Sequence, residues 1–156
     1  MKHYLLGISA VLCVLGSIGI ANARSIQANA GNAQDPSNET CMRTAWAGGG
    51  ISNACGHSVV WNMPLVVDRS GSYMLSVWGY ADGGTSCTAW SMNADGTIYD
   101  VNGRTFSSPI QVQSLVGAGD NFPIFVANGG YLMLECNVAP WQIPGGTTKI
   151  YSVNWQ

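Results

Sequence analysis

Few residues of this chain could carry out catalysis. Of its two histidines, only His57 lies beyond the apolar N-terminal run, so any catalytic triad must use it. Its neighbour Ser58 would point to the opposite face of a strand. The sequence has neither the G-x-S-x-G nucleophile motif nor the H-E-x-x-H pair of zinc hydrolases. We therefore interpret His57 as a surface or turn residue, predict no catalytic residue and do not expect an enzyme.

Paired carboxylates are the other route to hydrolysis, since glycosidases place two of them across a cleft. Glu135 is the best single candidate because it interrupts the apolar segment 131–138. Strand alternation instead puts it on the solvent face. A hydrolase remains an alternative, and it would need Glu135 or His57 beside another titratable group in a pocket. The aspartates are expected to cap turns, where Gly or Ser accompanies them: Asp68, Asp82, Asp95 and Asp120.

Residues 91–98 place oxygen donors at alternate positions before Gly96, as calcium loops do. However, the first position is Ser91 rather than Asp, and Asn102 stands where a bidentate Glu is needed. A hairpin closed by Asp95 and Gly96 explains the same residues. We predict no metal and no cofactor, and calcium binding by residues 91–102 stays open, as does glycosylation at the Asn38 sequon.

Four cysteines remain once Cys13, which lies in the apolar N-terminal run, is set aside. An even number in an exported chain predicts two disulfides. Three pairings are open, and we favour one that closes a short Gly-rich loop and joins two predicted strands: Cys41–Cys55 and Cys87–Cys136. A zinc site suits the cysteines less well, because the sequence has no C-x-x-C pair.

The first segment has the features of a signal peptide. Lys2 and His3 form a basic head, an apolar run follows over residues 4–20, and Ala21-Asn22-Ala23 fits a signal peptidase. We expect cleavage after Ala23. The alternative is a retained transmembrane helix, for which the run of about 17 residues is at the lower limit. We therefore predict a secreted or periplasmic protein whose mature chain has no membrane span.

Composition predicts one folded domain and excludes one class of partner. Charged residues make up 9% of the 156 residues and hydrophobic ones 47%, the opposite of a disordered chain. The formal net charge of −2 argues against a nucleic-acid partner, which requires many cationic contacts. Residues 24–40 are polar and lack an apolar period. We expect a flexible leader there, followed by a single domain over residues 41–156.

Short segments rich in Val, Ile, Tyr, Trp and Thr alternate with turn signals from residue 58 onward. This pattern predicts an all-β, single antiparallel β-sandwich of jelly-roll-like or Greek-key type. The expected strands are 59–61 and 65–67, which flank Pro64, then 73–80, 86–92, 97–101, 110–116, 122–127, 131–138 and 149–155. The expected turns are 68–71, 82–84, 95–96, 102–103, 128–130 and 144–146.

Alternation within the strands leaves one conflict. If Cys87 bonds Cys136, the Cys87 face is inward and Trp90 points outward. Either Trp90 is a surface aromatic, or the pairing or register is wrong.

Tryptophans provide the main functional prediction, because six are more than one core of this size usually needs. Trp46 lies in the Gly-rich loop 45–50, and Trp141 lies between two prolines. An exposed indole suits a sugar ring or a protein partner, although loop indoles also cover the ends of sandwiches. We predict a secreted non-catalytic binding module whose Trp46, Trp141 and Trp90 contact a glycan or a surface protein. The alternative is a small structural or inhibitor-like envelope protein with no small-molecule site.

Overall fold

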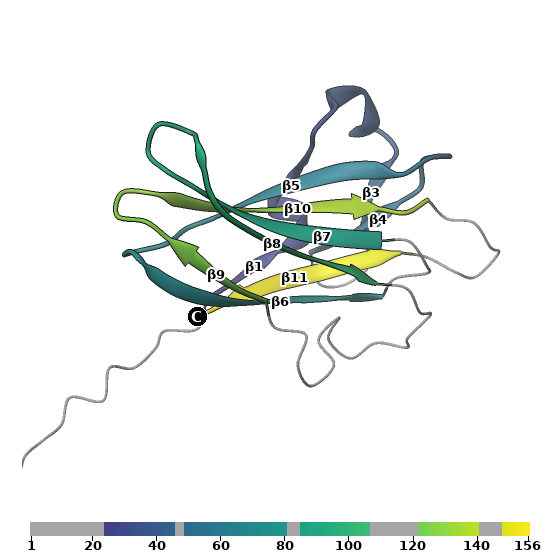
Figure 1. Cartoon of the computed structure of the whole chain (residues 1–156). Helices are drawn as coiled ribbons and strands as arrows, with labels where there is room; N and C mark the ends of the chain where they lie inside the picture. Colours follow the sequence, from purple (N-terminus) through teal and green to yellow (C-terminus); the bar gives the residue numbers. More distant parts are fainter. Residues whose placement is uncertain (1–23, 46–48, 81–84, 107–121, 141–147) are drawn as a thin grey trace, which may run out of the picture.

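Two antiparallel β-sheets face each other across one hydrophobic core (Figure 1). The computed structural model describes residues 24–45, 49–80, 85–106, 122–140 and 148–156. We name the six-stranded layer sheet A and the five-stranded layer sheet B. The predicted all-β sandwich is confirmed.

Sheet A has the order β3-β4-β11-β6-β9, and β1 pairs with β11 beside β4. Its strands are β1 (Arg24–Gln27), β3 (Met42–Ala45), β4 (Gly50–Asn53), β6 (Gly71–Tyr80), β9 (Phe122–Val126) and β11 (Lys149–Trp155).

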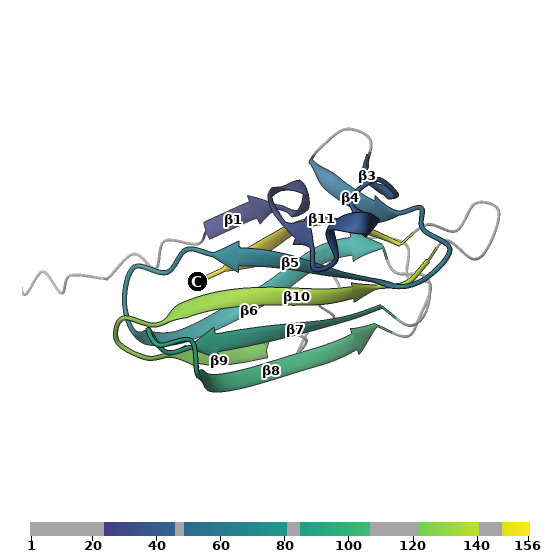
Figure 2. The ribbon, with the colours of Figure 1, turned by 90° about the horizontal axis from the view of Figure 1, so that it is seen from above.

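Sheet B has the order β2-β5-β10-β7-β8, and its four long strands lie side by side in Figure 2. Its strands are β2 (Asn32–Ala33), β5 (Val59–Leu65), β7 (Thr85–Met92), β8 (Ile98–Phe106) and β10 (Tyr131–Val138).

Alternating side chains build the core as the sequence predicts. In β10, Leu132, Leu134 and Val138 are buried while Tyr131 and Asn137 are exposed. In β7, burial also alternates strictly from residue to residue. Each sheet therefore turns one apolar face toward the other, and its second face is free for function.

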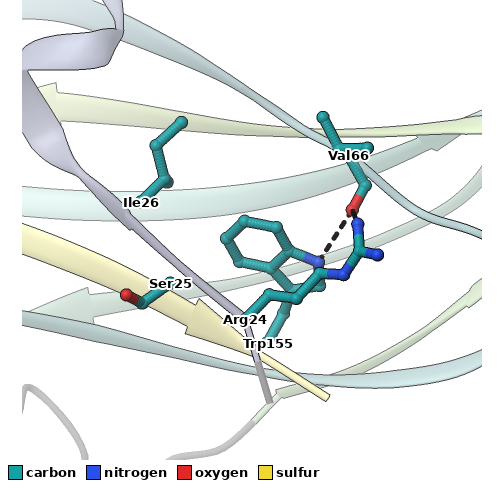
Figure 3. Close-up of a pocket in the computed structure, with 5 residues that line it drawn as sticks. All are labelled: Arg24, Ser25, Ile26, Val66 and Trp155. Atoms are coloured by element: carbon teal, nitrogen blue, oxygen red, sulfur yellow. Dashed lines mark hydrogen bonds between the residues drawn. The ribbon is translucent and has the colours of Figure 1, made fainter. Parts of the chain in front are cut away.

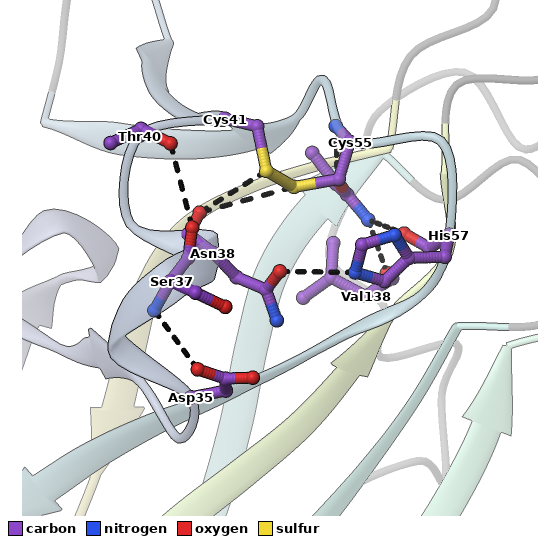
Figure 4. Close-up of a disulfide and its surroundings, with 9 residues drawn as sticks. Asp35, Ser37, Asn38, Thr40, Cys41, Cys55, His57 and Val138 are labelled. Atoms are coloured by element: carbon purple, nitrogen blue, oxygen red, sulfur yellow. Dashed lines mark hydrogen bonds between the residues drawn. A yellow bond between two sulfur atoms is a disulfide. The ribbon is translucent and has the colours of Figure 1, made fainter.

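Both favoured disulfides are confirmed. Cys87 and Cys136 lie directly opposite each other on the neighbouring strands β7 and β10, and both are fully buried. Cys41 and Cys55 join the start of β3 to the end of β4 and fasten the 3₁₀ helix Pro36–Asn38 (Figure 4). In that loop the carbonyl oxygen of Asn38 accepts from the backbone N–H of Cys41 at 3.2 Å.

The prediction of a flexible leader over residues 24–40 is wrong. Residues 24–27 form β1, and the segment continues through a 3₁₀ helix (Ala28–Ala30) into β2. Ala28 and Ala33 are buried, and the Trp61 indole donates its Nε1–H to the Ala28 carbonyl at 2.9 Å. Small residues give little hydropathy signal, yet they fit where the chain passes closely over the sheet.

Two predicted breaks in strands are also wrong. Asn102 and Gly103 lie within β8 rather than in a turn, since Gly103 allows close approach: a Cβ there would meet Thr88 Oγ1 at 2.8 Å. Pro64 lies within β5, outside the stretch that β2 pairs, so its missing N–H costs no ladder hydrogen bond on that side.

Other predictions fall in two groups. The strands 131–138 and 149–155 match β10 and β11 end to end, and the turns at Gly96 and Gly129 have the expected positive φ. The predicted strand 110–116, the turns 82–84 and 144–146, and the signal peptide 1–23 lie outside the described residues. Within the part of the chain that the structure describes, no helix is long and apolar enough to cross a bilayer.

Candidate functional site

Trp90 lies on the outer face of sheet B, which resolves the conflict in the sequence pattern. Cys87, Ala89 and Ser91 are buried, and Trp90 between them points outward and is partly exposed. The other two predicted ligand contacts, Trp46 and Trp141, lie outside the described residues.

An apolar row crosses the outer face of sheet B at Trp90. The strand register places Trp90 opposite Met133 on β10 and opposite Val101 on β8. Met133 in turn faces Pro64 on β5. Directly opposite side chains in such ladders have Cβ atoms about 5 Å apart. Because Val101 is 50% exposed, the row ends in an open apolar surface beside the indole.

A polar row runs parallel to the apolar one, two residues along each strand. Glu135 on β10 lies between Thr88 on β7 and Asn62 on β5. Within the described residues, none of these three side chains forms a hydrogen bond or ion pair with the protein. We call the two rows the Trp90 face: Pro64, Met133, Trp90 and Val101, with Asn62, Glu135 and Thr88.

Two further polar features distinguish this face. The Trp90 Nε1 and the Asn62 Oδ1 are buried atoms without a hydrogen-bond partner. Gly103 lies opposite Thr88, so the polar row meets no side chain on β8. Tyr131, which is 44% exposed, lies opposite Met92 beyond the apolar row and extends the surface toward the β7–β8 turn.

The β7–β8 turn rises above sheet B at one end of this surface (Figure 1). The Asp95 carboxylate is used within the hairpin: its Oδ1 accepts from Thr97 Oγ1 at 2.7 Å and from Thr97 N–H at 2.9 Å. These bonds hold the pKa of Asp95 below its ordinary value. The predicted hairpin therefore explains the residues that resembled a calcium loop.

We expect the Asp95 carboxyl to titrate below the usual aspartate range. The pKa of Asp95 is lower in the folded state than in the unfolded state. The stability that its carboxylate gives the turn is therefore present above the unfolded-state pKa and is lost as the pH falls through the folded-state pKa. An NMR pH titration of the Thr97 amide should show this transition. Asp95→Asn should abolish it, and a midpoint at or above the ordinary aspartate value would contradict the expectation.

The residues considered for catalysis do not form a catalytic group. The His57 Nε2 lies 3.0 Å from Asn38 Oδ1, beside the Cys41–Cys55 bond (Figure 4). Glu135 points to solvent from the middle of β10, as the alternation predicts. Among the described residues, no three His, Cys, Asp or Glu side chains gather in one place.

A cavity of about 490 Å³ opens between β1 and the chain that follows β5. It is lined by Arg24, Ser25, Ile26, Val66 and Trp155 (Figure 3). Its two nitrogen-bearing side chains, Arg24 and Trp155, are already bonded within the protein. The Trp155 and Arg24 side chains both donate to the Val66 carbonyl, at 3.0 and 3.2 Å, and Arg24 also pairs with Asp68. We interpret these hydrogen bonds and the ion pair as structural contacts that link sheet A to the chain that leaves sheet B.

Comparisons with known proteins show the fold. No family model matches the chain, and no curated protein matches it. Among solved structures, the chain is similar to the apo form of BiXyn10A CBM1, with a TM-score of 0.51 and 14% identity over 85% of this chain and 96% of that one.

A second similar structure is CBM86, described as a low-affinity xylan binding module from the gut symbiont Roseburia intestinalis. Its TM-score is 0.39 at 13% identity, over 86% of this chain and 94% of that one. The similarity to BiXyn10A CBM1 shows a shared fold, and the weaker one carries no argument.

Proposed function

We propose that this protein is a secreted, non-catalytic carbohydrate-binding module whose Trp90 face holds a neutral glycan. The observation that carries the proposal is the juxtaposition of an outward indole with a row of unpartnered polar side chains on one sheet face. The shared fold with BiXyn10A CBM1, a carbohydrate-binding module, supports it. The two disulfides suit an oxidising, extracytoplasmic compartment.

The chemistry of the two rows matches that of a sugar chain. The apolar face of a pyranose ring stacks on an indole, and its hydroxyl groups both donate and accept hydrogen bonds. Asn62, Thr88 and Glu135 offer partners of both kinds beside Trp90. The carboxylate of Glu135 would repel the carboxylate of a uronic acid bound on this face. The Trp90 face therefore favours uncharged sugars.

Trp46 and Trp141 remain proposed contacts. Both precede short Gly-rich stretches, and Trp46 lies between the cysteines of the smaller disulfide loop. Loop indoles of this kind would lengthen a binding surface beyond the strands.

Replacing Trp90 with alanine is expected to weaken neutral-glycan binding about 30-fold, the effect of removing one central aromatic contact. Isothermal titration calorimetry against a panel of neutral polysaccharides measures it. Trp78→Ala is the matched control, because Trp78 is an outward indole on the opposite sheet and is 40% exposed.

Two results would contradict the proposal. One is a Trp90→Ala protein that folds, by circular dichroism, and binds as the native protein does. The other is a native protein that binds none of the polysaccharides, which would support the structural or inhibitor-like alternative.

A further inference from the structure

Sheet A presents a second outer face whose charge is opposite to that of the Trp90 face. None of its six strands contains Asp or Glu, whereas three cationic residues lie in them: Arg24, Arg43 and Lys149. Arg24 is used in the ion pair with Asp68. The other two cations, Arg43 and Lys149, are available to a ligand.

Trp78 points outward from this face near the C-terminal end of β6 and is 40% exposed. It lies in the expected strand 73–80, but the sequence pattern did not single it out as a binding residue. The register places Ser152 opposite Trp78, and Asn154 opposite Ser76, in the adjacent row. Within the described residues, the side chains of Ser76, Ser152 and Asn154 form no hydrogen bond with the protein. Their hydroxyl and amide groups are therefore free for a ligand.

Lys149 borders the indole on its other side, and Arg43 lies two strands farther along the same row. Lys149 lies opposite Tyr80, two residues from Trp78 along β6, and such diagonal neighbours are about 7–8 Å apart. Arg43 follows in the same row, because Arg43 faces Ser52 on β4 and Ser52 faces Lys149. Neither cation has an ion-pair partner among the described residues. We call this surface the Trp78 face: Trp78, Ser76, Ser152, Asn154, Lys149 and Arg43.

We propose that the Trp78 face is a second binding site and that it takes an acidic glycan, one whose sugar rings carry carboxylates. The indole would stack on a ring, the serines and Asn154 would bond its hydroxyl groups, and Lys149 and Arg43 would pair with the carboxylates. Two cations are too few for the salt-dependent phosphate contacts of a nucleic-acid binder. This inference rests on the proposed glycan-binding function for its ligand class.

The two sites would work independently. The outer faces of sheets A and B point in opposite directions across the sandwich (Figure 1). One sugar chain therefore cannot lie on Trp78 and Trp90 at once without wrapping around the edge. The negative charge of Glu135 would make the Trp90 face prefer neutral sugars. The positive charge of Lys149 would make the Trp78 face prefer acidic ones.

The test uses a matched pair of polysaccharides, polygalacturonic acid and its fully methyl-esterified form, with the intact exported protein. Because the uncharged ester could bind at the Trp90 face, the two polymers are compared in Trp90→Ala, where polygalacturonic acid should bind more strongly than the ester. In the native protein we expect polygalacturonate binding that weakens as salt is raised. Trp78→Ala and the double variant Lys149→Gln/Arg43→Gln should each weaken it about tenfold. Trp90→Ala should leave it unchanged, and thermal melts would show that each variant folds.

The outcomes separate this inference from the proposed function. Unchanged polygalacturonate binding in the folded charge variant, or loss of it in Trp90→Ala, overturns the second site. Native protein that binds neutral glycans through Trp90 but ignores polygalacturonate also overturns it and leaves the proposed function standing. Polygalacturonate binding that depends on Trp78, without any neutral-glycan binding, supports the second site and removes the role of the Trp90 face.

Discussion

Asn53→Ala is expected to destabilise the protein by about 3–5 kcal/mol, because it leaves two buried backbone groups and one part-buried backbone group without partners. Asn53 is 2% exposed. Its Nδ2 donates to the carbonyl oxygens of His57 at 2.9 Å and Val138 at 2.7 Å, and its Oδ1 accepts from the Cys55 N–H at 2.8 Å. This single amide therefore ties β4 of sheet A to the end of β10 in sheet B.

Urea unfolding monitored by circular dichroism would measure the loss. Asn137→Ala is the matched control, since Asn137 is exposed on β10 and its removal should cost less than about 0.5 kcal/mol. An Asn53→Ala protein as stable as this control would show that the amide does not join the sheets.

Asn53→Asp removes the two hydrogen-bond donors of the Asn53 amide but keeps the size of the side chain. It therefore separates the effect of the lost hydrogen bonds from the effect of lost packing. It keeps the acceptor for Cys55 but turns a carboxylate toward two carbonyl oxygens, which disfavours the charged form. We expect the carboxyl to titrate above its ordinary value in the folded state. The variant should then be more stable in acid than at neutral pH. Its free energy of unfolding decreases as the pH rises from the carboxyl's pKa in the unfolded chain to its raised pKa in the folded state.

Removing the Cys87–Cys136 bond by a double alanine substitution is expected to cost about 4 kcal/mol, since the bond closes a long loop in the unfolded chain. The two cysteines are 49 residues apart, whereas Cys41 and Cys55 are only 14 apart. Removing the shorter link should cost about 3 kcal/mol by the same argument. Guanidinium unfolding of both double variants would compare them. A larger loss for the Cys41/Cys55 variant would contradict loop closure as the main term.

The same bond has a second consequence for the Trp90 face. It holds β7 and β10 in the register that sets Trp90 beside Met133 and Thr88 beside Glu135. A slip of one residue would turn every outward side chain of a strand inward. The disulfide thus keeps the proposed binding rows on the same face.

Local pattern was enough to predict several features of this protein. Alternation with period two placed Glu135 on the solvent face, and it placed Trp90 on the outer face once Cys87 was paired with Cys136. Which face of a strand a side chain points to depends on the strand's own geometry. It can therefore be inferred without knowing the neighbouring strands. Gly96 and Gly129 likewise mark turns by their backbone freedom alone.

Other features depended on contacts between distant segments. Residues 24–40 form β1 and β2 because β11 and β5 supply the pairing partners, and a polar sequence rich in small residues carries no local sign of this. Gly103 resembles a turn residue in the sequence, but it serves the close approach of β8 to Thr88.

The binding faces show the same division. The sequence predicted an outward Trp90 only on condition that Cys87 bonds Cys136, and it predicted Glu135 on the solvent face. It could not pair either residue with Asn62 on β5 or find Trp78 beside Lys149. Strand order and register decide which side chains become neighbours. They are determined by the packing of the whole sandwich, because backbone hydrogen bonds between strands are nearly independent of side-chain identity.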